Sequence, residues 1–232
     1  MFFFDPMYLL FVLPAIILTM YAQAKVHGTY RKFSQVRNAQ NLTGAQVARY
    51  LLRAKGLGDV PVEMTPGELT DHYDPGKRVL RLSDGVYNAP SVAAMGIAAH
   101  EVGHVYQHND NGYVFMRLRA PLVPVANIGS NAGVWLAMLG VFMQSAQLLL
   151  LGVILFGAAV VFTLVTLPIE LNASNRAMQA LRSCSLVSAS EYRGARSVLS
   201  AAALTYVAAA LQSVMILLYF VLRFVGMDRR SD

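Results

Sequence analysis

The sequence predicts a mainly α-helical membrane protein, in which a multi-span helix bundle carries a small α+β domain outside the bilayer. Two observations predict this fold class. The chain of 232 residues is 56% hydrophobic and only 14% charged, whereas ordinary soluble domains contain about 25% charged residues. Four stretches are also long and apolar enough to cross a bilayer core of about 30 Å. Residues 25–120 and 170–200 remain outside these stretches, which is enough chain for one small domain built from two pieces.

The first spanning helix is expected at residues 7–24, with Pro14 inside it. A cleaved export signal is the alternative, because Ala22-Gln23-Ala24 resembles the cleavage site of such a signal. However, residues 1–6 contain Asp5 and no Lys or Arg, whereas an export signal is positively charged at this end. We therefore expect residues 1–24 to form an uncleaved transmembrane anchor.

A transmembrane hairpin is expected at residues 121–169, which contain no charged residue. Two spans fit this length, at residues 123–143 and 148–167, with a polar turn at residues 144–147 between them. The earlier span is the less apolar of the two because of three polar residues in its first half, Asn127, Ser130 and Asn131.

The last span is expected at residues 201–222, within a C-terminal transmembrane segment at residues 201–225. Basic residues identify the cytoplasmic loops of membrane proteins. They follow the first span and fill the segment at residues 170–200, as Lys25, Arg31, Lys32, Arg37, Arg49, Arg53, Lys55, Arg176, Arg182, Arg193 and Arg196. We therefore expect both segments in the cytoplasm and the N-terminus outside. Three C-terminal residues oppose this orientation, namely Arg223, Arg229 and Arg230.

The composition also argues against other classes of function. The net charge of +6 could suggest nucleic acid, but the basic residues lie beside apolar spans and no aromatic-basic binding module occurs. A transporter is disfavoured because the spans contain no ionisable residue to mark an ion path. The single cysteine, Cys184, cannot form an intramolecular disulfide, which is compatible with a reducing cytosol.

Within the first extramembrane segment, residues 43–55 predict an amphipathic helix that Gly56 ends. A turn at residues 74–76 leads into a short strand at residues 79–82. As an edge strand it could pair with an extended peptide, and a plain strand in a small sheet is an equal alternative.

A helix is expected at residues 91–107, with Ser91 as its cap, and it contains His100-Glu101-Val102-Gly103-His104. Residues four apart share one helical face, so His100 and His104 can bind one metal ion. Glu101 lies one step round the helix, where it can take a proton from a metal-bound water without being a ligand. The two glycines of this helix, Gly96 and Gly103, would each cost about 1 kcal/mol, which is more readily tolerated if close backbone packing at the site needs them. We therefore interpret the pattern as a zinc-dependent hydrolytic centre and not as a chance occurrence of these residues.

Catalytic zinc takes three protein ligands, and three residues compete for the third place. His108 would lie about 12 Å along the helix from His100, which is too far for one ion. Asp110 stands where proteases with HEXXHxxGxx place a further ligand, but Gln107 replaces the glycine that turns their chain back. Glu170 follows the predicted hairpin, which returns the chain to the membrane face that it left. We therefore expect Glu170 as the ligand, its alternative role being an ordinary helix-start glutamate.

The sequence resembles the neutral zinc metallopeptidases of the YugP type, a family of bacterial integral-membrane proteins, over nearly the whole chain. The resemblance is carried by residues 69–75, 80–83, 86–88, 98–104 and 168–170, with Ala173 and Ser174. It implies zinc bound by His100, His104 and a glutamate, with Glu101 as general base.

More distantly, the chain is similar to membrane gluzincins of the HtpX and CAAX-protease kind. Their third ligand opens a Glu-x-x-Ala-Asp motif, whereas this sequence has Ser174 in the place of the aspartate. That aspartate orients a ligand histidine, a role that Asn172 or Asn175 could take over.

The combined prediction is a membrane zinc endopeptidase that cleaves proteins or peptides, including membrane proteins, and does not bind nucleic acid. It would lie in the bacterial inner or plasma membrane, with a zincin-like catalytic domain facing the cytoplasm. Candidate donors to the transition state are His72, Tyr73 and Arg176. The alternative is a non-catalytic membrane scaffold stapled by its metal, although such a site would more often have four ligands and no use for Glu101.

Overall fold

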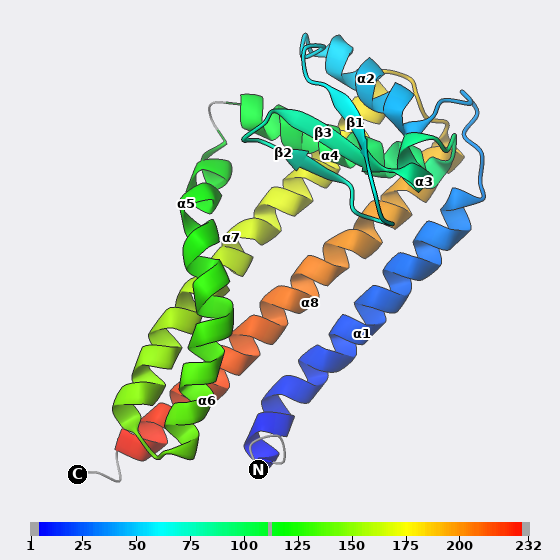
Figure 1. Cartoon of the computed structure of the whole chain (residues 1–232). Coiled ribbons are helices and arrows are strands. Elements are labelled where there is room, and N and C mark those ends of the chain that lie inside the picture. The colour runs from blue at the N-terminus through cyan, green and yellow to red at the C-terminus, as the bar shows by residue number, and fades with distance from the viewer. Residues whose placement is uncertain (1–4, 111–112, 229–232) are drawn as a thin grey trace. The chain divides into compact units, whose positions relative to one another are not determined.

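The computed structural model describes residues 5–110 and 113–228, and the chain forms two compact units. The first unit combines Met1–Ala22, Val114–Pro168 and Thr205–Asp232, and the second combines Gln23–Tyr113 and Ile169–Leu204. Helices α1, α7 and α8 contribute to both units (Figure 1). Arg229 and Arg230, which opposed the predicted orientation, lie outside the described residues, as do residues 1–4 of the predicted anchor.

The structure contains four candidate membrane-spanning helices in its described part, as many as the sequence predicted. Four helices are long and apolar enough to cross a membrane, and their ranges are Pro6–Ser34, Pro121–Phe142, Ala146–Ser183 and Ala189–Met227. The first is α1, the third is α7, and the fourth belongs to α8, which covers Ala189–Asp228. The second combines most of α5 (Val114–Ile128), the π-helix η2 (Gly129–Gly133) and α6 (Val134–Phe142). Several helices extend beyond the predicted spans, because α1, α7 and α8 continue into the second unit.

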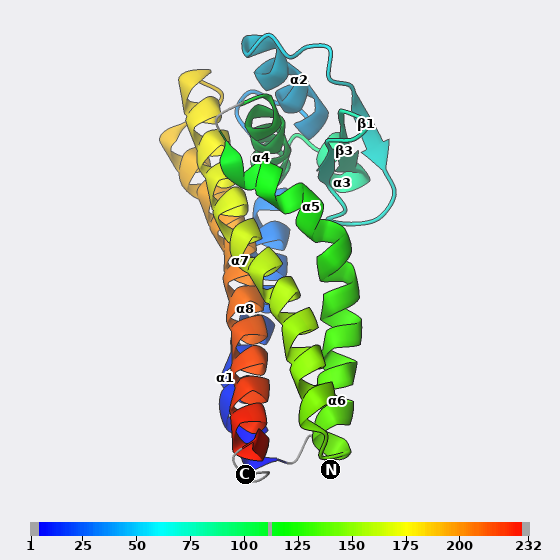
Figure 2. The ribbon, with the colours of Figure 1, turned by 90° about the vertical axis from the view of Figure 1, so that its left-hand side faces the viewer.

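In the first unit, α5 and α6 run beside the first part of α7 as the predicted hairpin (Figure 2). The turn between them has Gln144 in the left-handed region, with φ of 54°. A Cβ atom on Gly140 would clash with the backbone nitrogen of Leu149, so this glycine lets α6 approach α7 closely. Aromatic residues of α8, Tyr219 and Phe220, are fully buried against the same end of the hairpin.

The second unit begins its own fold with α2 (Gly44–Ala54), the predicted amphipathic helix. Thr43 caps it by accepting a hydrogen bond from the backbone N–H of Gln46, whose side chain accepts one from Thr43 in return. Such a reciprocal pair satisfies two backbone donors that a helix start otherwise leaves open. Gly56 follows the helix with φ of 71°, a conformation that glycine adopts without strain.

A three-stranded sheet follows, with β1 (Val62–Thr65), β2 (His72–Asp74) and β3 (Val79–Ser83) in the order β1-β3-β2. β3 pairs in parallel with β1 and antiparallel with β2. The strand predicted at residues 79–82 therefore exists. Of its two interpretations, the edge strand was wrong and the plain strand in a small sheet is correct, because it is the central strand. Four of its five residues are buried, a pattern that fits a strand covered on both sides.

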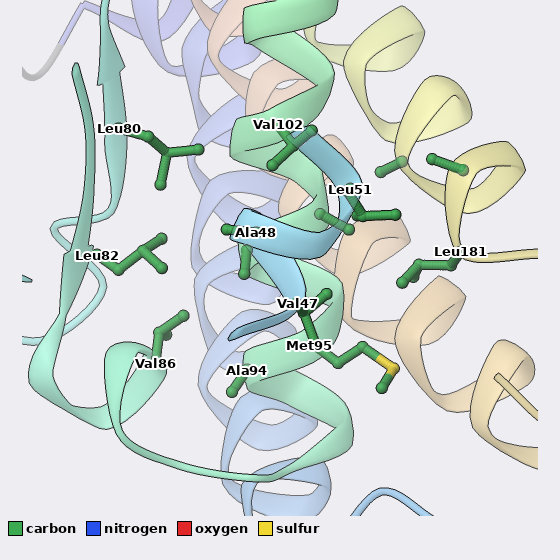
Figure 3. Packing of buried hydrophobic residues seen from close by; sticks show 14 of the residues in the cluster. Val47, Ala48, Leu51, Leu80, Leu82, Val86, Ala94, Met95, Val102 and Leu181 are labelled. Atoms are coloured by element: carbon green, nitrogen blue, oxygen red, sulfur yellow. The ribbon is translucent and has the colours of Figure 1, made fainter. Parts of the chain in front are cut away.

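Helix α4 (Val92–Asn109) follows the short helix α3 (Asp84–Tyr87) and forms the centre of the second unit. Twelve of its residues are buried, so it packs on several sides at once. Figure 3 shows Met95 and Val102 of α4 among Leu51 of α2, Leu80 of β3 and Leu181 of α7. Each fully buried side chain of this size contributes about 1.5–3 kcal/mol through the hydrophobic effect.

Helix α4 contacts the backbone of α7 at Gly103. A Cβ atom on this residue would overlap the carbonyl oxygen of Ala173 and lie 3.1 Å from its carbonyl carbon. Backbone atoms cannot move aside as a flexible side chain can, so only glycine fits at this crossing. Close backbone packing, the condition under which the sequence tolerates this glycine, is therefore present at Gly103.

We predict that Gly103→Ala destabilises the protein, because overpacking a rigid contact costs about 1–3 kcal/mol. Gly28→Ala is the matched control, since a Cβ atom there would meet nothing within 4 Å; alanine should leave stability unchanged or raise it by up to about 1 kcal/mol. Thermal unfolding of both variants in detergent measures the difference. Equal melting temperatures for Gly103→Ala and wild type would contradict the close crossing of α4 and α7.

Candidate metal centre

His100 and His104 project from one face of α4, as their spacing predicts. Ser91 caps the start of the helix, and its hydroxyl accepts a hydrogen bond of 3.1 Å from the backbone N–H of Ala94. The two rings stand nearly perpendicular, at 88°, and their Nε2 atoms lie 3.2 Å apart. Both nitrogens therefore converge on one point beside the helix.

Glu170 joins the two histidines from α7. Its Oε2 atom lies 3.2 Å from Nε2 of His100 and 3.4 Å from Nε2 of His104. The predicted alternative role of Glu170 as a helix-start residue does not apply, because α7 runs unbroken from Ala146 to Ser183 through Pro168. Glu170 lies one turn before Ala173, so the close crossing at Gly103 is what brings its carboxylate to the imidazoles.

The geometry of this group fits a zinc ion. Ligand atoms bound to zinc at about 2.0–2.1 Å in a tetrahedral arrangement lie about 3.3–3.4 Å apart. The three separations in the structure, 3.2, 3.2 and 3.4 Å, match such edges. Two imidazole nitrogens and one carboxylate oxygen are also a donor set that suits zinc. Among the described residues, His100, His104 and Glu170 form the group that could hold a metal ion.

Glu101 lies between the two histidines in sequence and is 7% exposed. Burial raises the pKa of its carboxyl group, while the charges of His100 and His104 act in the opposite direction. Its side chain makes no hydrogen bond within the described ranges, in contrast to Glu170. A buried carboxylate without a fixed partner, next to a metal-binding group, is available to exchange protons.

Two further side chains hold the outer nitrogens of the histidine rings. Nδ1 of His100 lies 3.1 Å from Oγ of Ser174, and Nδ1 of His104 lies 3.0 Å from Oε1 of Gln107. Ser174 thus contacts a histidine itself, whereas Asn172 contacts Gln107 and Arg176 instead. Asn175 is exposed and makes no contact with either histidine in the described structure.

Sequence reasoning missed the position of Gln107, which it treated only as a missing glycine. The available signal was its spacing, since residue i+3 on a helix lies on the same face as residue i. A buried glutamine one turn after a ligand histidine can reach the ring nitrogen that faces away from the metal.

The competing third ligands are engaged elsewhere. Nδ1 of His108 lies 2.7 Å from the hydroxyl of Tyr73, and Asp110 forms an ion pair of 2.7 Å with Arg176. Neither belongs to the metal-binding group of the described structure. The same contacts occupy Tyr73 and Arg176, two of the candidate donors to the transition state. The third, His72, lies on β2 with Nδ1 2.8 Å from the carbonyl oxygen of Thr70.

A pocket of about 810 Å³ opens in the second unit beside α4 and α7. Its polar lining includes Lys55, Asp110, Asn172 and Arg176. None of the three residues of the metal-binding group lines it. The pocket is therefore separate from the converging ligand atoms.

Comparison with known proteins agrees with this geometry. Residues 8–225 match the model of a family described as "Putative neutral zinc metallopeptidase". The chain is 46% identical over 220 residues to a protein of Bacillus subtilis (strain 168) named "Putative membrane protease YugP". The alignment covers 95% of this chain and 97% of that relative. No solved structure gives a significant match. With a His-His-Glu group that could bind a metal and a family match over nearly its whole length, the chain belongs to this zinc metallopeptidase family.

Proposed function

We propose that the protein is an integral-membrane zinc endopeptidase of the gluzincin type, in which His100, His104 and Glu170 hold the metal. The observation that carries this proposal is the set of ligand-atom separations, which equal the edges of a zinc tetrahedron within about 0.2 Å. The name of the Bacillus relative supports peptide bonds as the bonds cleaved. Substrates would be proteins or peptides, including membrane proteins.

The proposed mechanism divides two tasks among four residues. His100, His104 and Glu170 would hold the ion, and Glu101 would not be a ligand. When bound, zinc supplies Lewis acidity, which makes water more acidic and polarises a peptide carbonyl. Glu101 accepts the proton of the attacking water and returns it to the nitrogen of the leaving amine. Its buried position beside the ligands keeps this proton within the site.

The alternative function is a non-catalytic membrane scaffold in which the metal has the structural role of linking α4 to α7. A site with that purpose is usually closed by four protein ligands. The described group contains three, and a carboxylate without a hydrogen-bond partner lies beside them. Both features favour catalysis, and hydrolytic activity separates the two functions directly.

We further propose the domain organisation and orientation that the sequence indicates. Residues 25–120 and 170–200 would form the catalytic domain on the cytoplasmic side of the bacterial inner or plasma membrane. Residues 1–24, 121–169 and 201–225 would provide the anchor, the hairpin and the last span. The basic residues of the catalytic segments and the four apolar helices support this arrangement.

Glu101→Gln should retain about one zinc ion per chain and lose hydrolysis by several orders of magnitude, because the proton acceptor is removed while the ligands stay. Zinc content and cleavage of casein by purified protein measure the two effects. Glu68→Gln, at an exposed position, is the control and should retain both. Equal activity of Glu101→Gln and wild type would remove the enzyme proposal, and loss of zinc would give Glu101 a structural role instead.

Glu170→Ala should weaken zinc binding by more than about 100-fold, because one of three ligands is lost. Asp110→Ala and His108→Ala should change the affinity far less, since both side chains are engaged outside the group. Competition with a chelator measures all three variants. The ligand assignment would be contradicted if Asp110→Ala lost zinc while Glu170→Ala still bound it.

Topology reporters should place residues 60 and 185 in the cytoplasm and the turn at Ser145 outside, because the basic segments stay on the inner side. Fusions of a reporter that is active on one side of the membrane measure this. If residues 60 and 185 were on opposite sides, the histidines and Glu170 could not share one metal. If both were external, the enzyme would act on substrates outside the cell.

A further inference from the structure

We propose that Gln107 positions His104 for the metal and determines which nitrogen of its ring carries the proton. This inference rests on the proposed zinc centre. Gln107 is 1% exposed, and each of its polar groups has a partner. Its Oε1 atom lies 3.0 Å from Nδ1 of His104, and its Nε2 atom donates to the backbone oxygen of Ile169 at 2.8 Å and to Oδ1 of Asn172 at 3.0 Å.

The chemistry of the neighbours fixes the orientation of the Gln107 amide. The backbone carbonyl of Ile169 can only accept a hydrogen bond, so the NH₂ group of Gln107 must face it. A second constraint comes from Arg176, whose guanidinium can only donate. Nε of Arg176 donates to Oδ1 of Asn172 at 2.7 Å, so this Asn172 atom is an oxygen and an acceptor. It can therefore only accept from Gln107 as well. Both hydrogens of the Gln107 amide are thereby used.

The remaining atom of the amide, Oε1, is an acceptor and faces Nδ1 of His104. Nδ1 must then carry the proton of the neutral ring, which leaves Nε2 with a free lone pair. Nε2 is the atom that faces Nε2 of His100 and the carboxylate of Glu170. Metals bind the unprotonated nitrogen of imidazole, so Gln107 holds His104 in the form that can act as a ligand.

Gln107 also acts on the other helix of the site. Ile169, whose carbonyl it binds, directly precedes Glu170. One side chain therefore orients a ligand on α4 and anchors the backbone next to the ligand on α7. Arg176 strengthens this link, because it binds Asn172 and is itself held by Asp110 at 2.7 Å.

His100 is supported in a different way. Its Nδ1 atom faces the hydroxyl of Ser174, which can either donate or accept. This contact does not decide the position of the proton. The two histidines should therefore depend unequally on their partners, His104 strongly on Gln107 and His100 weakly on Ser174.

Two substitutions of Gln107 separate positioning from simple packing. Gln107→Leu has a similar size but removes the acceptor and both donors, whereas Gln107→Glu keeps an acceptor for His104 and removes the donors. Both should lower the melting temperature of the full-length protein in detergent. Zinc affinity, measured by chelator competition, should fall about 10–100-fold in Gln107→Leu and stay within about threefold of wild type in Gln107→Glu. Gln179→Leu, at an exposed position on α7, is the control and should change neither property.

A second readout needs no metal. In metal-free protein labelled with ¹⁵N-histidine, at a pH high enough for the His104 ring to be neutral, His104 should carry its proton on Nδ1. The signal is assigned by its loss in His104→Ala. Gln107→Leu should shift the proton partly to Nε2, Gln107→Glu should keep it on Nδ1, and Ser174→Ala should leave His104 unchanged.

Three results would overturn the role of Gln107 and leave the metal centre in place. One is a proton on Nε2 of His104 in the wild type, and another is unchanged zinc affinity in Gln107→Leu. The third is an equal loss of affinity in Gln107→Leu and Gln107→Glu, which would indicate packing alone. Equal zinc binding by wild type and His104→Ala would instead overturn the metal centre, and this proposal with it. Loss of zinc in His104→Ala without loss in Gln107→Leu would overturn the role of Gln107 alone.

Discussion

The metal-binding group depends on one constraint, the close crossing of α4 and α7 at Gly103 and Ala173. The spacing of His100 and His104 is a local property that any helix would provide. The carboxylate of Glu170 comes from a helix about 70 residues further along the chain, and only a short distance between the two helix axes allows it to reach both imidazoles. A larger residue at position 103 would push α4 and α7 apart and move the Glu170 carboxylate away from the two imidazoles. This contact offsets the cost of about 1 kcal/mol that glycine has in the middle of a helix.

Burial of polar groups around this crossing is balanced by hydrogen bonds. Gln107 and Glu170 are both buried, and each has partners for its polar atoms. A buried polar group without a partner costs about 1–3 kcal/mol. The hydrogen bonds that join Gln107, Asn172 and Arg176 avoid this cost. Glu101 is the exception among these residues, because its carboxylate has no hydrogen bond in the described structure. That difference is what distinguishes a candidate proton acceptor from a ligand that the helices hold in place.

The sequence predicted the features that local pattern or chain topology decides. Uncharged stretches indicated the four spans, the i and i+4 spacing indicated the histidine pair, and the hairpin argument indicated Glu170. The capping of α2 by Thr43 and the stop at Gly56 also follow local rules. Features that depend on contacts between distant segments were not predictable in this way. The strands β1 and β2 were missed and the place of β3 in the sheet was left open, because sheet order is set by pairing between segments and not by the pattern within one strand. The role of Gln107 was missed because its partners Ile169 and Asn172 lie on another helix.

The most direct test is the location of the metal itself. Crystals of the protein grown with zinc and measured at the zinc absorption edge would show the ion as a single anomalous peak. The structure predicts this peak between α4 and α7, about 2.0–2.2 Å from Nε2 of His100, Nε2 of His104 and an oxygen of Glu170. A peak bound by His108 or Asp110, or a fully occupied ion without a contact to Glu170, would contradict the site.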